Sequence, residues 1–326
     1  MNINDFSKCL IPLLATVFIN IGCSDGTDST AADAGNTTDN TTAATVDPEL
    51  FLPDALVGAV STENCTLSGG TAATCYRITI AGAPANNMIG PFCPPNIDSD
   101  ATEGGIWFDG SGELYQLDGD FIKNLSNLYG SGWQLYNAET GKVNITDSQL
   151  ACEAAARPNV DPAYRNYCVE CKLEYTGAVQ QTFLIPVTPV PAKTQSSIRS
   201  DVGIALNGVV LAPAAPVDAI LSNYTIAAFD DCGGHINPFE GYHYHASTGC
   251  SEVIVEADGH AGLIGFALDG YRIYAMKNMA GDEDYDLDQC RGHSDSSRGY
   301  HYHAASAGEN MFIGCFSGEQ GSIIQE

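Results

Sequence analysis

One pattern of cysteine, glycine, histidine and tyrosine occurs twice in the chain and constrains its fold more than any other feature. The first copy is Cys-Gly-Gly-His from position 232, followed after six residues by Tyr-His-Tyr-His-Ala from position 242. The second is Cys-Arg-Gly-His from position 290, followed after six residues by the same pentapeptide from position 300. All seven histidines lie between His235 and His303, so any histidine chemistry is confined to this duplicated region.

The duplicated unit begins upstream of its cysteine. Residues 202–209 (VGIALNGV) and 264–271 (IGFALDGY) each read as an apolar strand, an Asn-Gly or Asp-Gly turn and a second apolar run. Such a turn between apolar runs is the strongest short-range signal for a β-hairpin. Two copies of one unit can pack about a pseudo-two-fold axis. We expect this packing to bring the two histidine motifs near each other.

Outside the duplicated unit the chain also reads mainly as strands and loops. Alternating or β-branched runs predict strands over 75–80, 106–108, 114–117 and 182–185, with turns at Asp109-Gly110 and Asp118-Gly119. The best helix candidate is 149–157, with Ser148 as its N-cap. The predicted fold class is therefore mainly β and disulfide-rich, with internally duplicated hairpin and strand units and few short helices.

The N-terminus predicts export. Residues 1–22 contain a short apolar run after Lys8, which suits a signal peptide. Cys23 follows Gly22 as in a bacterial lipobox and is the candidate for lipidation. Residues 23–47 have almost nothing to bury and predict a flexible tether. We therefore expect a lipoprotein anchored in the cell envelope, periplasmic or surface-facing, or otherwise a secreted protein.

The cysteine count fits that compartment. Of twelve cysteines, removal of Cys9 with the signal and of Cys23 to lipid leaves ten, enough for five disulfides. Three pairs are suggested by position, one closing a hairpin and two bracketing the histidine motifs: Cys65–Cys75, Cys232–Cys250 and Cys290–Cys315. The pairing of Cys93, Cys152, Cys168 and Cys171 stays open, and Cys168-x-x-Cys171 favours a structural disulfide role over a redox one.

The charge balance excludes one class of partner. Thirteen lysines and arginines face 40 aspartates and glutamates, for a formal net charge of −27. Such a surface repels nucleic acid and anionic lipid headgroups, and its long-range field favours cations. An acidic surface kept for solubility explains the same composition.

The chain resembles the YHYH domain family, which is named for the Tyr-His-Tyr-His tetrapeptide. The matching stretches are 203–209, 231–235, 242–245, 265–274, 286–288, 292–293, 300–303 and 313–316, with 80–92 resembling the family's opening segment. The similarity spans about 76–318 and implies one YHYH-type domain over 48–326, with an N-terminal part at 48–195 and the duplicated core at 196–318. The resemblance implies fold boundaries and frequent export, and it brings no activity.

The spacing of the histidines predicts metal binding. Alternate residues of a strand share a face, so His243 and His245 would point one way, with His235 folded back toward them. Three imidazoles with an open position form the ligand set of a catalytic zinc, and imidazole also suits copper. The ligand candidates are His235, His243, His245, His293, His301 and His303, and the candidates for supporting roles are Tyr242, Tyr244, Tyr300, Tyr302, His260 and Asp258.

Two other interpretations remain open at this stage. Buried tyrosine–histidine pairs can form a structural hydrogen-bond network without a metal. The motifs could also belong to a cell-surface module that recognises a glycan or a protein. A metal site could in turn be hydrolytic or redox-active, or serve only to capture the ion, so the sequence leaves open whether the protein is an enzyme.

The remaining candidates are weaker. Glu240 precedes the first tetrapeptide and could act as a general base, although Arg298 occupies the corresponding position of the second copy. The alternating aspartates between Asp282 and Asp288 raise the question of calcium. They fail the EF-hand pattern, because the sixth and twelfth positions are Leu287 and His293, so a solvated acidic loop is favoured.

Overall fold

The computed structural model describes residues 45–156, 160–251, 253–284 and 286–324. The predicted signal peptide, Cys23 and all but the last three residues of the predicted tether lie outside the described residues. Within the described ranges, no helix is long and apolar enough to cross a membrane. The fold is mainly β, as expected, with four short α-helices and five disulfides among these residues.

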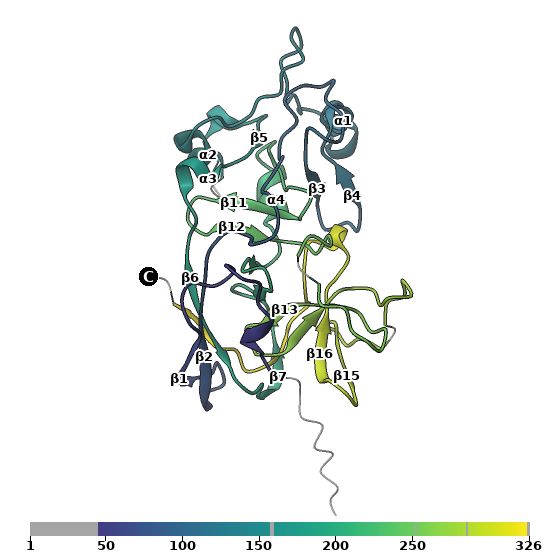
Figure 1. Ribbon diagram of the computed structural model, residues 1–326. Coiled ribbons are helices and arrows are strands. Elements are labelled where there is room, and N and C mark those ends of the chain that lie inside the picture. The colour runs from purple at the N-terminus through teal and green to yellow at the C-terminus, as the bar shows by residue number, and fades with distance from the viewer. Residues whose placement is uncertain (1–44, 157–159, 252, 285, 325–326) are drawn as a thin grey trace, which may run out of the picture. The chain divides into compact units, whose positions relative to one another are not determined.

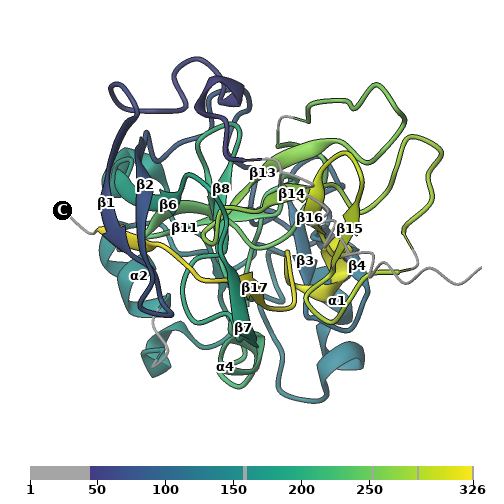
Figure 2. The ribbon, with the colours of Figure 1, turned by 90° about the horizontal axis from the view of Figure 1, so that it is seen from below.

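The central element is an eight-stranded sheet built from the duplicated unit. Its strand order is β11-β12-β9-β8-β13-β14-β16-β15. The first copy supplies β8 (Gly203–Ala205), β9 (Val210–Leu211), β11 (Gly234–Asn237) and β12 (Gly241–Tyr244). The second copy supplies β13 (Leu263–Ala267), β14 (Arg272–Tyr274), β15 (Gly292–Asp295) and β16 (Gly299–His303). Figure 2 shows β13, β14, β16 and β15 following one another across one half of this sheet.

The strand order is a palindrome with respect to the two copies. The antiparallel pair of β8 with β13, in register at Ile204 and Phe266, forms its centre. The predicted pseudo-two-fold arrangement is therefore present in the sheet. The expectation that it brings the two motifs together is wrong, because each copy adds its motif hairpin outward from the shared centre. Five strand spacings separate β12 from β16, roughly 24 Å.

The Asx-Gly turns connect the first two strands of each copy. Gly208 and Gly270 adopt positive φ angles of 82° and 86°, which the preceding Asn207 and Asp269 do not share. In the first turn, the backbone N–H of Ala205 donates to the Val209 oxygen at 2.9 Å, which leaves a three-residue loop over 206–208 rather than the two-residue turn typical of Asn-Gly. A Cβ on Gly208 would lie 2.3 Å from the carbonyl oxygen of Ala55, so this turn requires glycine for space as well as for its φ angle.

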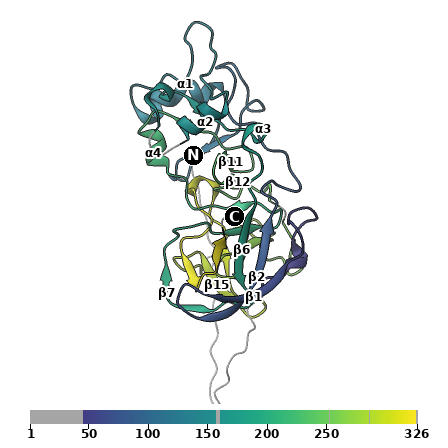
Figure 3. The same cartoon turned by 90° about the vertical axis from the view of Figure 1, so that its left-hand side faces the viewer.

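A second sheet packs strands from distant parts of the sequence. Its order is β1-β2-β6-β18, from β1 (Ser61–Thr66), β2 (Ala72–Ile80), β6 (Gln181–Pro186) and β18 (Ser322–Ile324), with β1, β2 and β6 side by side in Figure 3. The proline-rich stretch after β6 leads into β7 (Pro191–Ser196), which pairs with β17 (Phe316–Gly318).

The remaining elements are short and lie between β2 and the first motif. They are β3 (Ile106–Phe108), β4 (Leu114–Gln116), β5 (Cys168–Val169), β10 (Ile226–Ala227), α1 (Gly119–Tyr129), α2 (Gln149–Ala155), α3 (Leu173–Thr176) and α4 (Val217–Leu221) (Figure 1). One 3₁₀ turn, at Pro162–Tyr164, lies in the same region, and two others lie outside it at Pro48–Leu50 and Ala307–Glu309. Ser148 caps α2 as predicted, by accepting from the backbone N–H of Ala151.

One local prediction is wrong at Asp118. Its side chain accepts from the backbone N–H of Phe121 at 2.8 Å and caps α1, where the Asp-Gly pair had predicted a turn. The signal for the helix was present in the apolar positions 121, 122 and 125, which are buried on one face.

The disulfides confirm the three pairs that were predicted from the sequence. The three pairs suggested by position are formed: Cys65–Cys75, Cys232–Cys250 and Cys290–Cys315. The four cysteines left open pair as Cys93–Cys168 and Cys152–Cys171. Every cysteine among the described residues is therefore oxidised, and no thiolate is left there to serve as a ligand.

Candidate metal centres

Each motif hairpin begins at an aspartate two residues before the cysteine. Asp230 and Asp288 each accept from the backbone N–H groups two and four residues further on, at 2.8 to 3.1 Å. These hydrogen bonds hold a turn that leads into β11 in the first copy and into β15 in the second. A histidine stands at the second position of each strand. These aspartates were missed as part of the repeat, although both stand at the same offset from a motif cysteine.

The first centre consists of His235, His243 and His245. His235 lies directly opposite His243 in the antiparallel pair of β11 with β12, and His245 follows two residues later. The three Nε2 atoms are mutually 3.0 to 3.2 Å apart. The structure thus brings together the three histidines that the spacing grouped in the first copy.

Backbone carbonyl groups fix the tautomers of two of these rings. Nδ1 of His243 lies 3.0 Å from the Gly241 oxygen, and Nδ1 of His245 lies 2.6 Å from the Pro213 oxygen. A carbonyl oxygen only accepts, so each Nδ1 carries the hydrogen and each Nε2 presents a lone pair. The close contact between these two Nε2 atoms is then not a hydrogen bond, and it becomes favourable when a cation sits between them.

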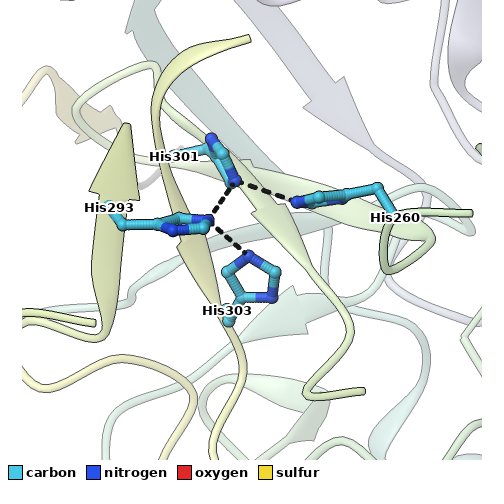
Figure 4. A group of neighbouring side chains, drawn as sticks. All are labelled: His260, His293, His301 and His303. Atoms are coloured by element: carbon cyan, nitrogen blue, oxygen red, sulfur yellow. Dashed lines mark hydrogen bonds between the residues drawn. The ribbon is translucent and has the colours of Figure 1, made fainter. Parts of the chain in front are cut away.

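The second centre contains His260, His293, His301 and His303 (Figure 4). The Nε2 atom of His301 lies 2.9 Å from that of His293 and 3.1 Å from that of His260, and the Nε2 atoms of His293 and His303 are 3.2 Å apart. His260, expected in a supporting role, is thus a member of the histidine group that could hold an ion. It lies in the loop before β13. In the sheet order, β13 and β15 lie on opposite sides of β16, so His260 and His293 approach His301 from opposite sides (Figure 4).

All four Nδ1 atoms of the second centre face oxygen acceptors. His260, His301 and His303 lie 2.9 to 3.0 Å from the carbonyl oxygens of residues 261, 299 and 275, and His293 lies 2.8 Å from a carboxylate oxygen of Asp286. The four Nε2 lone pairs therefore point at one another. A carboxylate oxygen of Asp284 lies 3.4 Å from Nε2 of His303 and can supply a further ligand.

The separations match those around a tetrahedral ion. Nitrogen ligands at about 2.05 Å from zinc would be about 3.3 Å apart on a tetrahedron. All three Nε2 pairs of the first centre, and three of the six pairs of the second, lie 2.9 to 3.2 Å apart, close to that value. The chemistry of the donor set, imidazole nitrogen throughout with an oxygen beside the second centre, suits zinc or copper.

Burial keeps five of the seven imidazoles neutral. It lowers the pKa of His245 and His301 to about 3 and that of His303 to about 4, chiefly through desolvation. Burial likewise holds the pKa of His235 well below its usual range and lowers that of His243. Neutral imidazole is the form that binds metal, so protons do not compete for these nitrogens near pH 7.

The tyrosines of the motif face away from the histidines. Tyr242 donates to Asp230 at 2.8 Å and Tyr302 donates to Asp269 at 2.6 Å. Tyr300 donates to Asp288, and Tyr244 accepts from the Asn207 amide at 2.9 Å. Tyr244 and Tyr302 thus join their hairpins to the Asx-Gly turns, whereas Tyr242 and Tyr300 bind the aspartates that precede the motif cysteines. Tyr274, which sequence analysis did not single out, packs its ring against His260 at 4.7 Å between centroids.

The two centres differ at one equivalent position of the repeat, which is Glu240 in the first copy and Arg298 in the second. Arg298 is largely buried and contacts Asp258 and Asp295, each at 2.6 Å. Asp258 in turn accepts from the backbone N–H of His260 at 3.1 Å. Asp258 therefore helps to hold the loop that carries the fourth imidazole. The first copy has Glu240 in place of this arginine, and its histidine set has three members.

The first centre lies on the wall of a cavity of about 360 Å³. The cavity is lined by all three of its histidines, by Glu240 and Asp201, and by many small apolar side chains. Burial, with a contribution from the charge of Glu240, raises the pKa of Asp201 to about 7. A carboxyl group that is partly protonated at neutral pH can donate as well as accept a hydrogen bond.

The acidic stretch that raised the question of calcium contacts the second centre. Asp284 and Asp286 are turned toward His303 and His293, and Asp288 accepts from backbone N–H groups. These contacts give the carboxylates roles beside the histidines. Calcium binding outside the EF-hand pattern was the less favoured interpretation of this stretch, and no observation tests it.

Comparison with known proteins supports the family. Residues 182–284 match the family model described as YHYH protein. The match contains the first tetrapeptide and ends before the second, so it is narrower than the span of about 76–318 indicated by resemblance. The comparisons with curated proteins and with solved structures gave no match.

Proposed function

We propose that this chain, which carries a YHYH family segment over residues 182–284, binds a transition metal ion, zinc or copper, at each of two separate centres. The first centre is formed by His235, His243 and His245, and the second by the histidine set completed by His260. The observation that carries the proposal is the convergence of histidine Nε2 atoms. In five of these rings a carbonyl oxygen accepts a hydrogen bond from Nδ1, which leaves a lone pair on Nε2.

A purely structural hydrogen-bond network accounts for this geometry less well. A neutral imidazole forms a stable network by donating from one nitrogen and accepting at the other. Six of the seven histidines already donate from Nδ1 to an oxygen, so their Nε2 atoms have no hydrogen to share, and only His235 is free to donate at Nε2. Leaving such acceptors buried against one another costs free energy, which a divalent cation would offset.

Recognition of a glycan or protein through the histidines is also less favoured. His243, His301 and His303 are at most 3% exposed, so their rings offer little surface to a macromolecule. A recognition surface elsewhere on the protein would be independent of the metal centres.

The proposal includes a difference in role between the centres. Three imidazoles beside a cavity leave a position for an exogenous ligand, as in catalytic sites, whereas four imidazoles with a nearby carboxylate can complete the coordination of an ion, as in structural sites. A reaction, hydrolytic or redox, would therefore take place at the first centre. Five disulfides fit export to an oxidising compartment, and we extend the proposal to an exported lipoprotein of the cell envelope.

Elemental analysis with matched variants tests the proposal. The first centre is removed by His243→Ala with His245→Ala, and the second by His301→Ala with His303→Ala. We expect near-stoichiometric zinc or copper at two ions per chain, falling to one in either double variant and to none in the quadruple variant. Circular dichroism of each variant checks that the fold remains. Folded wild-type protein that takes up no zinc or copper overturns the proposal.

A further inference from the structure

The cavity at the first centre combines features that no other described part of the molecule joins. Its volume of about 360 Å³ lies within the usual range of small-molecule sites and equals roughly a dozen water molecules at about 30 Å³ each. The three histidines whose Nε2 atoms converge are all among its lining residues. The cavity therefore offers a coordination position together with room for the body of a ligand.

The cavity walls select for an apolar body. Alanines 212, 219, 227 and 228 line it, together with Ile220 and Ile236 and with Phe92. Small apolar side chains from α4 (Val217–Leu221) and β10 leave space next to the histidines without offering hydrogen bonds. A ligand that fills this space gains free energy from the burial of its methylene or aromatic groups.

The polar groups of the cavity define the other end of the ligand. A divalent ion on three neutral imidazoles carries its full charge into the cavity and attracts an anionic oxygen. Arg199, exposed on the lining, adds a positive charge. Asp201 forms no hydrogen bond or ion pair with any described residue, and its carboxyl group is available to the oxygen atoms of a ligand.

We propose that this cavity binds a small organic carboxylate, whose oxygen coordinates the ion of the first centre and whose apolar body lies against the α4 and β10 wall. This inference rests on the proposed metal binding and names the ligand class of that centre. A carboxylate fits better than a polyanion such as a phosphate ester, because Asp201 and Glu240 also line the cavity and would repel a second negative charge. The second centre does not take the ligand, because a fourth imidazole and Asp284 lie close enough to complete the coordination of its ion.

Cobalt substitution gives a direct test with acetate and butyrate as probes. Co²⁺ is loaded into the His301→Ala with His303→Ala variant, in which only the first centre remains. We expect both acids to change the visible absorption of the bound cobalt. Each buried methylene strengthens binding about fourfold, so butyrate, with two more than acetate, should bind about fifteenfold more tightly. Inorganic phosphate should bind more weakly than butyrate.

Substitutions in the wall separate the cavity from simple coordination. Ala219→Phe fills the space beside α4, and Ala219→Leu is a smaller intrusion for the case in which the larger ring disturbs folding. Both variants should keep cobalt and acetate binding, while their affinity for butyrate falls to about their affinity for acetate. Ala163→Leu, on a surface turn that does not line the cavity, is the control and should change neither ligand.

The outcomes distinguish this inference from the underlying metal site. Cobalt that binds but responds to neither acid, or that binds acetate and butyrate equally, overturns the inference and leaves the metal centre intact. A phosphate affinity above that of butyrate also overturns it. A protein that binds no metal overturns the proposed function instead.

Discussion

Substitution of Arg298 should weaken the second centre without touching a ligand. The guanidinium group joins Asp258, beside the loop of His260, to Asp295 at the end of β15. It also lies 3.6 Å from Glu256 and 5.7 Å from the centre of the Tyr274 ring. Arg298→Leu removes the cation that contacts these three carboxylates, whose repulsion would then move the His260 loop away from β16.

The magnitude follows from the role of such supporting groups. Loss of a group that orients a metal ligand lowers metal affinity by about 10- to 100-fold, or about 1.4 to 2.7 kcal/mol. The loop also loses two short contacts of a side chain that is 7% exposed, so the stability of the metal-free protein should fall as well. Arg298→Lys keeps the charge but cannot hold both carboxylates with a planar fork, and its effect should be intermediate.

Competition with a chromophoric chelator measures the effect at one centre at a time. The background His243→Ala with His245→Ala leaves only the second centre, where Arg298→Leu is compared with Arg298→Lys. The matched control is Glu240→Gln, which changes the equivalent position of the first copy and should leave the second centre unaltered. If Arg298→Leu keeps full affinity while His260→Ala loses it, Arg298 does not position His260 and the reasoning fails.

Three further predictions concern the stability of the protein. The metal-free protein should lose stability as the pH falls from about 6.5 toward 3, because buried imidazoles such as His245 and His301 have lowered pKa values and stay neutral while the unfolded chain binds protons. Each such imidazole lowers the free energy of unfolding by up to about 1.4 kcal/mol per pH unit. An unchanged urea midpoint between pH 7 and 4 would contradict this. Asp230→Ala removes the acceptor of several buried hydrogen bonds and should lower the free energy of unfolding by about 3 kcal/mol or more, whereas a loss below 1 kcal/mol in denaturant titration would show that the turn forms without it. Replacing Cys290 and Cys315 together by alanine should cost about 3 kcal/mol and weaken metal binding at the second centre alone, and equal weakening at both centres in chelator competition would refute a local effect.

The sequence was sufficient for the parts of the site that depend on local periodicity. Strand alternation placed His243 and His245 on one face, and the common offset of His235 placed it opposite them. The Asx-Gly pairs located the hairpins that form the sheet centre. These features require only neighbours along the chain or a direct comparison of two copies.

The sequence was insufficient where contacts depend on the assembled sheet. His260 joins the second centre from an irregular loop whose position follows from Arg298 and Asp258 rather than from any period. The separation of the two centres follows from which strands meet at the middle of the sheet, and the pairing of Cys93 with Cys168 depends on elements far apart in sequence. The helix at Asp118 was a misread local signal, because Asp-Gly serves both as a turn and as the start of a helix.

The central claim is that two histidine sets, carried by strands well apart in the order of one sheet, each hold one metal ion. X-ray absorption of the copper- or zinc-loaded protein tests it most directly when recorded on the two double variants, each of which retains one set. The account predicts one ion per chain in each variant, with three imidazole ligands at the first centre and four at the second. A single ion that is lost in both variants, or ions without imidazole ligands, would contradict it.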